Sequence, residues 1–430
     1  MSGRSDTCDV AVVGAGAAGL FAATWACRAA REAGTVLDVR AFDGAARLGA
    51  KILVAGGGRC NVTHWRVEDR DYATDANSIL VRRVLARFGV DDTVSFFAER
   101  GVELKREETG KLFPVTDKAR TVLDALLGAA RDAGVDLRHP CRVSAVRTDG
   151  SGFVVETESG PMRAAKVILA TGGRSLPKSG SDGLGLEIAR SLGHSLTPLV
   201  VPALAPLVVS DGHWVRELSG IAVPAELSIV GGDGKPYRPA SGTGFVRPKS
   251  PVLCTHFGLS GPAALDISRH LAHARKGDPG ARLVVNWLPE LDAERLEREL
   301  LARTGQSTLA ALRAIASAEV PERFLKAALA AAGVDASRGV QQVPKDLRRK
   351  LVRTLVASEI PVSGDRGFTY AETTAGGVPL GEIEIDSMAS RRCPGLFLCG
   401  EILDVDGRIG GFNFQWAWAS GFVAGMGVRG

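Results

Sequence analysis

The sequence has no apolar run near the length of about 18 residues that suggests a membrane-spanning helix, and its first ten residues, MSGRSDTCDV, lack the apolar core of a signal peptide. We therefore expect a cytoplasmic protein without a membrane partner. The seven cysteines are odd in number and include no C-x-x-C pair. This pattern argues against a disulfide framework, a zinc ribbon and a dithiol redox enzyme.

Histidine is also scarce, and the seven histidines are too scattered to form a recognised metal-ligand spacing, so we expect no catalytic metal. The 53 basic and 48 acidic residues leave a net charge of +5. Charge alone therefore neither demands nor excludes an anionic partner. The chain's 430 residues, 45% of them apolar, exceed what a single core usually supports. Two or three domains are expected.

The N-terminal stretch CDVAVVGAGAAGLFAATWACRAAREAG predicts a strand, a glycine turn and a helix. The apolar run from Val10 to Val13 suits a buried parallel strand, and the alanine-rich stretch from Leu20 to Ala33 has helical character. The following TVLDVRAFD predicts a second strand that ends at Asp43. Strand, glycine turn, helix and strand in this order are typical of a dinucleotide-binding unit.

Each glycine of the turn has a predicted role. Gly14 permits the tight turn, Gly16 lets the backbone approach a pyrophosphate, and Gly19 lets the helix pack on the strand. The helix N-terminus offers unpaired N–H groups to the phosphate charge. Asp43, 24 positions past Gly19, would accept hydrogen bonds from ribose hydroxyls.

Two later apolar strands also run into glycine turns. Val167 to Ala170 leads into Thr171, Gly172 and Gly173, and Leu396 to Cys399 leads into Gly400. A glycine turn at the end of a strand indicates close approach of another group to the backbone. The final helix carries Gly421 and Gly425, which we expect to pack closely against the sheet.

The stretch KILVAGGGRCNVTH contains three consecutive glycines, Gly56 to Gly58. Glycine loses more freedom on folding than any other residue, so this run predicts positive φ angles or a close contact. Between about Leu196 and Gly364 the sequence is first rich in proline, glycine and short strands and then largely helical. We therefore expect residues 1–195 and 365–430 to form one domain and residues 196–364 to form an inserted, substrate-facing domain.

The blocks GAKILVAGGGRCNVTH, VILATGGRSLPKSGSDGLGLEIARSLGH and GLFLCGEILDVDGRIGGFNFQWAWASG resemble the BaiN/YhiN-type FAD-dependent oxidoreductases. The resemblance covers nearly the whole chain. It implies an α/β fold, a Rossmann-like FAD-binding domain of the two-dinucleotide-binding-domain flavoprotein type, with an inserted β-barrel plus helical domain. It also implies FAD as the cofactor.

The resemblance further implies which residues hold FAD. Asp43 stands where the family usually has a glutamate, so the geometry at the ribose hydroxyls differs slightly. The expected contacts are Gly14, Gly16, Ala17, Ala18 and Gly19 at the pyrophosphate; Asp43, Val143, Ala170, Thr171, Gly172 and Gly173 in the adenosine half; and Gly56, Gly57, Gly58, Arg59, Cys60, Asn61, Gly400, Glu401, Asp404, Asn413, Phe414 and Gln415 in the flavin half.

Three residues are expected nearest the chemistry: Arg59, Cys60 and His256. The Cys60 thiol would donate the proton that completes hydride transfer, or would be a small packing residue. His256 would face the substrate, or would be a hydrogen-bonded structural histidine.

The leading hypothesis is a reductase in which NAD(P)H delivers hydride to flavin N5 and the flavin passes it to a conjugated C=C bond or a similar acceptor. The resemblance implies reductive chemistry, because family members are linked to steroid-like enones and to uridine in ribosomal RNA. Only one dinucleotide fingerprint is visible, so NAD(P)H would visit the open flavin face. A small-molecule substrate is expected, and the sequence does not indicate an oligomeric state.

Two alternatives remain open. The first is an FAD oxidase of small amines that uses oxygen. The second is a flavin-dependent RNA modification enzyme, which rests on KDLRRKLVRTL, where Lys345, Arg348, Arg349 and Arg353 could line one helical face. A solvated helix face is the simpler interpretation, since no aromatic stacking platform accompanies these charges.

Overall fold

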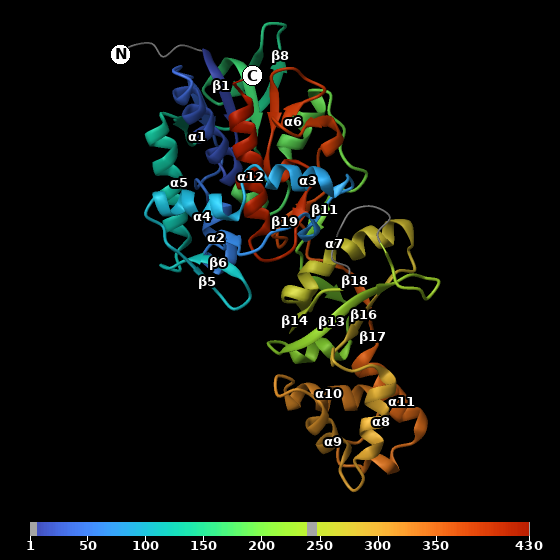
Figure 1. Ribbon diagram of the computed structural model, residues 1–430. Coiled ribbons are helices and arrows are strands. Elements are labelled where there is room, and N and C mark those ends of the chain that lie inside the picture. Colours follow the sequence, from blue (N-terminus) through green and yellow to red (C-terminus); the bar gives the residue numbers. More distant parts are fainter. Residues whose placement is uncertain (1–6, 239–246, 430) are drawn as a thin grey trace. The chain divides into compact units, whose positions relative to one another are not determined.

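The computed structural model describes residues 7–238 and 247–429. The described residues up to Pro202 and those from Ala371 onward form one compact unit, and those between Ala203 and Tyr370 form a second. Each unit has its own apolar core. Figure 1 shows that the blue strand β1 and the red helix α12, from opposite ends of the chain, belong to the same unit.

The first unit is built on a sheet whose central strands are parallel. Its order is β20-β21-β22-β10-β1-β2-β7, and β9 and β8 continue from β10. The strands are β1 (Thr7–Val13), β2 (Val39–Phe42), β7 (Asp136–Arg138), β8 (Val143–Thr148), β9 (Phe153–Thr157), β10 (Gly160–Leu169), β20 (Ile383–Glu384), β21 (Ala389–Ser390) and β22 (Leu396–Leu398). The strands predicted around Val10, Val167 and Leu396 are confirmed as β1, β10 and β22.

The helices α1 (Ala17–Glu32) and α12 (Phe412–Gly427) pack against each other in this unit. Their contact depends on glycine. A Cβ atom on Gly421 would lie 2.7 Å from the Ala18 carbonyl oxygen, and one on Gly425 would lie 2.5 Å from the Ala22 carbonyl oxygen. The glycines therefore face a helix. The prediction that they pack against the sheet is wrong, because a helix backbone comes closest to them.

The first unit contains further short elements around this sheet. They are α2 (Ala50–Gly58), β3 (Thr63–His64), β4 (Tyr72–Ala73), α3 (Ser78–Leu85), α4 (Val90–Glu99), β5 (Leu104–Arg106), β6 (Lys111–Pro114), α5 (Ala119–Ala133), α6 (Leu184–Ser191), β19 (Thr373–Ala375) and β23 (Asp406–Gly407). β11 (Val201–Ala203) pairs with β19.

A buried hydrogen-bond chain ties α6's end to β20 and β21. His194 Nδ1 lies 2.8 Å from Glu382 Oε2, and Ser390 Oγ lies 2.8 Å from His194 Nε2. Ser390 Oγ accepts hydrogen bonds from two backbone amides, at 3.0 and 2.9 Å, so its hydroxyl proton is directed to His194. Burial raises the pKa of the Glu382 carboxyl, but hydrogen bonds from Ser195 and His194 outweigh it and leave the pKa below its usual range. Because each polar group in this hydrogen-bond chain has a protein partner, we assign the chain a role in holding these segments together.

The second unit contains an antiparallel sheet of order β17-β16-β13-β14-β15-β12-β18. Its strands are β12 (Leu207–Val209), β13 (Ala222–Val230), β14 (Lys249–Thr255), β15 (Gly258–Ser260), β16 (Arg282–Asn286), β17 (Ser358–Ile360) and β18 (Val362–Asp365). β17 and β18 lie at opposite ends of the strand order, yet only Pro361 separates them along the chain. The sheet therefore curls into a half-barrel.

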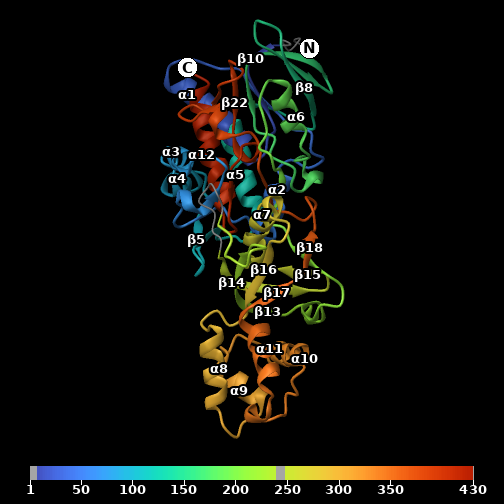
Figure 2. The same ribbon diagram turned by 90° about the vertical axis from the view of Figure 1, so that its right-hand side faces the viewer.

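Helix α7 (Pro262–Gly277) packs on β13 and β14. The other helices of the second unit are α8 (Ala293–Ala302), α9 (Thr308–Ile315), α10 (Glu322–Ala332) and α11 (Lys345–Val356). Figure 2 shows α8 to α11 grouped together; their yellow to orange colours follow their order in the sequence. None of the helices in the described ranges is long and apolar enough to span a membrane.

Candidate functional site

The parallel strands of the first unit bring four chain turns to one edge of the sheet. The Gly14 amide donates to the Phe42 carbonyl oxygen at 2.8 Å, and the Ala170 amide donates to the Val13 carbonyl oxygen at 2.9 Å. The Cys399 amide likewise donates to the β10 carbonyl of Leu169 at 3.1 Å. The turns after β1, β2, β10 and β22 are therefore neighbours. The carboxyl end of parallel strands is where such folds bind ligands.

The three fingerprint glycines have different surroundings. A Cβ atom on Gly14 would lie 2.5 Å from the Ala170 carbonyl oxygen, and one on Gly19 would lie 1.8 Å from the Gly14 carbonyl oxygen. These two glycines permit close packing. A Cβ atom on Gly16 would meet nothing within 4 Å. Gly16 begins α1 without a side-chain cap, so the backbone N–H groups of Ala17 and Ala18 lie at an open helix end.

Asp43 lies at this glycine turn. Its carboxylate accepts hydrogen bonds from the Ala15 amide at 3.0 Å and the Ala45 amide at 2.9 Å. The Cys141 amide donates to the Asp43 carbonyl oxygen at 2.7 Å, which brings the chain that enters β8 at Val143 to the same place. The structure thus brings Asp43 close to the segment that leads to Val143, and both residues are among those predicted for the adenosine half.

A second polar cluster lies at the turn after β22. Lys51 Nζ lies 2.5 Å from Glu401 Oε2 and 2.5 Å from Ser175 Oγ. Glu401 Oε1 accepts from Ser175 Oγ at 2.8 Å and from the Thr374 amide at 3.0 Å. A Cβ atom on Gly173 would lie 2.4 Å from Thr374 Oγ1, so the glycine lets these segments meet.

Sequence reasoning selected Glu401 and Gly173 but missed Lys51, Ser175 and Thr374. These three come from segments far apart along the chain, and Lys51 had only one signal, its place in the block that carries the resemblance. The side chains of Lys51 and Glu401 are 28% and 18% exposed, so the ion pair lies at the rim of the site and remains accessible to a ligand.

The glycine run turns as the sequence predicted. Gly56, Gly57 and Gly58 have φ angles of +57°, +69° and +85°, and Cys60 has +60°. A Cβ atom on Gly56 would lie 3.1 Å from the Phe113 ring, whereas one on Gly57 would meet nothing within 4 Å. Only Gly57 therefore leaves open space beside its backbone.

Arg59 and Cys60 follow this run but point to different surroundings. Arg59 stacks its guanidinium over the Phe113 ring at 4.0 Å from the centroid, and its Nη1 lies 2.6 Å from Glu107 Oε1. Its side chain is 40% exposed. Cys60 is fully buried in the core of the first unit, and burial raises the pKa of its thiol well above the usual range. This placement favours the packing alternative for Cys60.

The segment from Gly400 to Gln415 holds several expected contacts whose side chains already have protein partners. Asp404 Oδ2 accepts from the Asp75 amide at 2.8 Å. Asn413 exchanges two hydrogen bonds with the Gly407 backbone, at 2.8 and 2.9 Å. Gln415 is fully buried and donates to the Phe88 carbonyl oxygen at 3.0 Å. The side chains of Asp404, Asn413 and Gln415 are therefore already engaged within the protein.

Helix α12 begins in this segment without a side-chain cap on Gly411. The ring of Phe414, in its first turn, stacks on the Trp418 ring with centroids 5.5 Å apart. No side chain of the described residues caps the N–H groups of the first turn, and the positive end of the helix dipole favours an anionic group nearby.

His256 belongs to the second unit. It lies in the turn between β14 and β15, is exposed, and its carbonyl oxygen accepts from Arg216 Nε at 2.8 Å. Its ring contacts the Phe257 ring edge-to-face at 5.1 Å. Its predicted contact with substrate stays a prediction.

The site fits a dinucleotide. Buried side-chain atoms without a hydrogen-bond partner are found at Asn61 Oδ1, Ser181 Oγ and Thr373 Oγ1. Ser181 Oγ lies 2.8 Å from where a Cβ atom on Gly172 would be, and Thr373 precedes the Thr374 amide that binds Glu401. Together with two uncapped helix ends, these groups suit a ligand with phosphates and many polar atoms.

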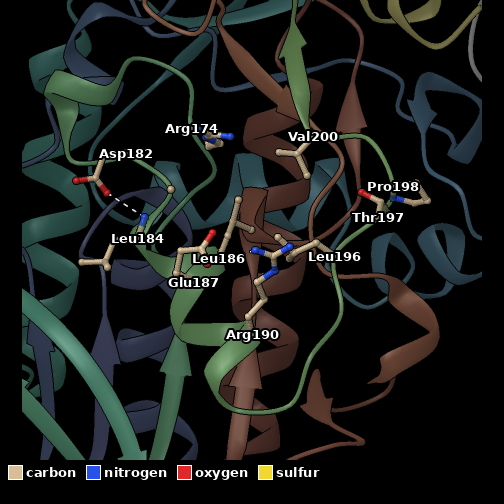
Figure 3. A pocket seen from close by; sticks show the side chains of 11 residues that line it. Arg174, Asp182, Leu184, Leu186, Glu187, Arg190, Leu196, Thr197, Pro198 and Val200 are labelled. Atoms are coloured by element: carbon tan, nitrogen blue, oxygen red, sulfur yellow. Dashed lines mark hydrogen bonds and ion pairs between the residues drawn. The ribbon is translucent and has the colours of Figure 1, made fainter. Parts of the chain in front are cut away.

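A cavity of about 530 Å³ lies beside the turn after β10 (Figure 3). Leu184, Leu186 and Leu196 give it an apolar wall, and Arg174 and Arg190 carry its positive charges. Asp182 and Glu187 also line it, so the lining has no net charge. Figure 3 shows the bond by which Asp182 accepts from the Leu184 amide, at 3.1 Å.

Comparison with known proteins identifies the family. The profile of the HI0933-like protein Rossmann domain matches residues 8–427. The chain belongs to this family. A relative from Clostridium scindens, 3-dehydro-bile acid delta(4,6)-reductase, is 32% identical over 97% of this chain and 98% of its own. The ribosomal RNA dihydrouridine synthase of Escherichia coli is 32% identical over 96% of both chains.

Solved structures related to this HI0933-like chain are more distant. The 3-ketosteroid delta1-dehydrogenase from Sterolibacterium denitrificans covers 98% of this chain and 99% of its own, with 14% identity and a TM-score of 0.49. The family membership confirms the predicted family, the Rossmann-type FAD-binding domain and the enzyme class, an FAD-dependent oxidoreductase.

Proposed function

We propose that the chain reduces a C=C bond conjugated to a carbonyl group, with NAD(P)H as the electron donor. The proposal rests on one observation: the names of two relatives describe reactions of the same kind. A delta(4,6)-reductase of a 3-dehydro compound acts on double bonds that are conjugated to the 3-carbonyl. Dihydrouridine is uridine whose C5=C6 bond, which is conjugated to the C4 carbonyl, has been reduced. Similarity across nearly the whole of both chains supports extending this chemistry to the present protein.

When bound, FAD supplies hydride transfer. The chain's own residues would bind and orient it. The open α1 N-terminus at Gly16 would hold the pyrophosphate, and Asp43 would accept from ribose hydroxyls. Lys51 and Glu401 would position the polar chain that leads to the flavin ring, and the α12 N-terminus would stabilise negative charge at the ring's pyrimidine edge.

Arg59 and Glu372 are the proposed groups for the substrate carbonyl and the proton. Arg59 follows the open backbone at Gly57 and would donate to a carbonyl oxygen, which increases acceptance of hydride at the conjugated carbon. Glu372 is an exposed residue, yet desolvation by the surrounding protein raises the pKa of its carboxyl, against the lowering effect of Lys111 and Lys51. A carboxyl whose pKa is raised holds its proton to higher pH than an ordinary glutamate does, as a general acid requires.

Anaerobic spectroscopy tests the reaction. NADH or NADPH should bleach the flavin absorbance of the purified protein, and a steroid with a conjugated 3-carbonyl should restore it. The matched control is the saturated 3-ketosteroid, which should leave the flavin bleached. If neither NADH nor NADPH bleaches the flavin, NAD(P)H is not the electron donor. If a small amine bleaches it and peroxide forms in air, the chain is an oxidase.

Separate variants test the two residues. Glu372→Gln should leave flavin bleaching by the nicotinamide intact and slow the restoration by the enone, since only the second step needs the proton. Arg59→Gln should also leave bleaching intact, but its main effect should be on KM for the enone. A Glu372→Gln enzyme with unchanged turnover across the pH range would remove Glu372 from the mechanism.

A further inference from the structure

Helix α11 presents one apolar and one cationic side. Its buried residues are Leu351, Val352, Leu355 and Val356. These residues pack into the core of the second unit, which turns the opposite side of the helix to solvent. The basic residues exposed on α11 are Lys345, Arg349, Lys350 and Arg353.

These four side chains differ from most cations around them. In the part of the chain that the structure describes, none of the four has a hydrogen-bond or ion-pair partner for its charged group. Arg348, predicted from the sequence to share their face, instead binds Glu297 of α8 at 3.1 Å and is only partly exposed. The single acidic residue exposed on the helix is Asp346, in its first turn. The exposed face therefore carries four positive charges and one negative charge.

The excess charge of the protein is concentrated around this helix. Residues 292–357, from the start of α8 to the end of α11, contain twelve Lys and Arg residues and eight Asp and Glu residues. Their net charge of +4 accounts for most of the +5 of the whole chain. Unneutralised cations gathered on one small region are the electrostatic pattern of a nucleic-acid-binding surface.

We propose that this face of α11 binds the phosphate groups of double-stranded RNA. Lys345, Arg349 and Arg353 are spaced by one helical turn each and form a row of about 12 Å, long enough to contact successive backbone phosphates. Duplex RNA is recognised through its shape, phosphates and 2′-hydroxyls, and it needs no base stacking on the protein. Within residues 292–357 the single aromatic residue is Phe324, which is fully buried, so single-strand stacking has no platform there.

The choice of RNA over DNA rests on the proposed function, because the uracil ring of RNA contains a C=C bond conjugated to a carbonyl group. The binding itself does not depend on turnover. If the wild-type protein does not reduce an enone, the proposed reaction is refuted but the binding face is not. If the wild-type protein does not bind duplex RNA, the binding face is refuted but the proposed reaction is not.

Fluorescence anisotropy with a labelled RNA duplex of about 16 base pairs, a length that small duplex-binding modules span, tests the proposal on the full-length holoenzyme. The test variant combines Lys345→Gln, Arg349→Gln and Arg353→Gln. The matched control combines Arg295→Gln, Arg313→Gln and Lys326→Gln, three exposed cations of the same helical region that pair with Glu299 or Glu322. Both variants lose the same net charge.

The test variant should bind the duplex roughly tenfold to a hundredfold more weakly, and the slope of log K against log salt should become shallower by about one for each contact removed. The control should retain wild-type affinity within about threefold, since its cations form exposed ion pairs of small net energy. FAD content and enone reduction should be unchanged in both variants.

Several results would overturn the proposal. An equal loss in both variants would mean that only net charge matters. Tighter binding of single-stranded RNA, or equal binding of a DNA duplex of the same sequence, would refute the recognition of duplex RNA. Vesicles of anionic lipid that bind the wild type but not the test variant, without duplex binding, would assign the face to a membrane surface.

Discussion

Gly57→Ala tests whether the glycine run makes room for FAD. Gly57 has φ +69° and ψ +30°, and a Cβ atom there would meet nothing within 4 Å of the protein. The substitution therefore creates no clash inside the chain. Its internal cost is that of a left-handed non-glycine residue, about 1 to 2 kcal/mol of folding free energy.

Gly34→Ala is the matched control. Gly34 has φ +73°, and a Cβ atom there would also meet nothing within 4 Å. It follows the C-terminal end of α1, whose 16 residues separate it from the glycine turn by about 24 Å. Both variants should lose the same amount of stability when the apoprotein is melted, since both add one methyl group to a left-handed residue in open space.

The two variants should differ in FAD affinity. If the cofactor ring occupies the space beside Gly57, the added methyl group overpacks a filled site, which costs about 1 to 3 kcal/mol, or roughly five- to 150-fold in Kd. Fluorescence titration of apoprotein with FAD measures this directly. Gly34→Ala should bind FAD like the wild type. Equal FAD affinity for Gly57→Ala and the wild type would refute the assignment of this loop to the flavin.

Three further outcomes are expected. Gly425→Ala should lower Tm, because its Cβ atom would lie 2.5 Å from a backbone oxygen of α1. Gly128→Ala in α5, where a Cβ atom would meet nothing within 4 Å, should raise Tm, because alanine favours a helix over glycine by about 1 kcal/mol. Because the pKa of Glu382 is lowered, its stabilising effect is present above the unfolded-state pKa and is lost as pH falls through the folded-state pKa, so Glu382→Gln should flatten the acid limb of the stability profile. Cys60→Ala should reduce stability and leave turnover per bound FAD unchanged; a lost turnover with full FAD content would restore the thiol to the mechanism.

The sequence predicted the strands and glycine turns of the first unit because both depend on local properties. Apolar runs such as Val10 to Val13 report burial, and Gly14 reports a backbone angle that few other residues adopt. A local sequence pattern does not show which segment of the chain packs against each glycine. The sequence predicts that Gly421 and Gly425 pack on the sheet, and only the three-dimensional packing shows that α1 lies against them.

The Lys51 cluster shows the same limit for the site. Lysine in a glycine-rich segment has many possible partners, and its contact with Glu401 spans 350 residues of chain. Parallel strand order brings these segments together, and no periodicity in either segment indicates the other. Sequence reasoning reached Glu401 through the family resemblance of the block that contains it. The local pattern located only the apolar strand and the glycine turn at Gly400 that precede this residue.

The polar residues at the sheet edge divide into two groups that the sequence cannot separate. Asp404, Asn413 and Gln415 have protein partners and hold the fold together. Asn61 and Ser181 have buried oxygens without a partner, and such atoms cost free energy until a ligand or water satisfies them. Apolar substitutions in the first group should therefore lower stability with or without FAD, whereas in the second group they should mainly weaken FAD binding.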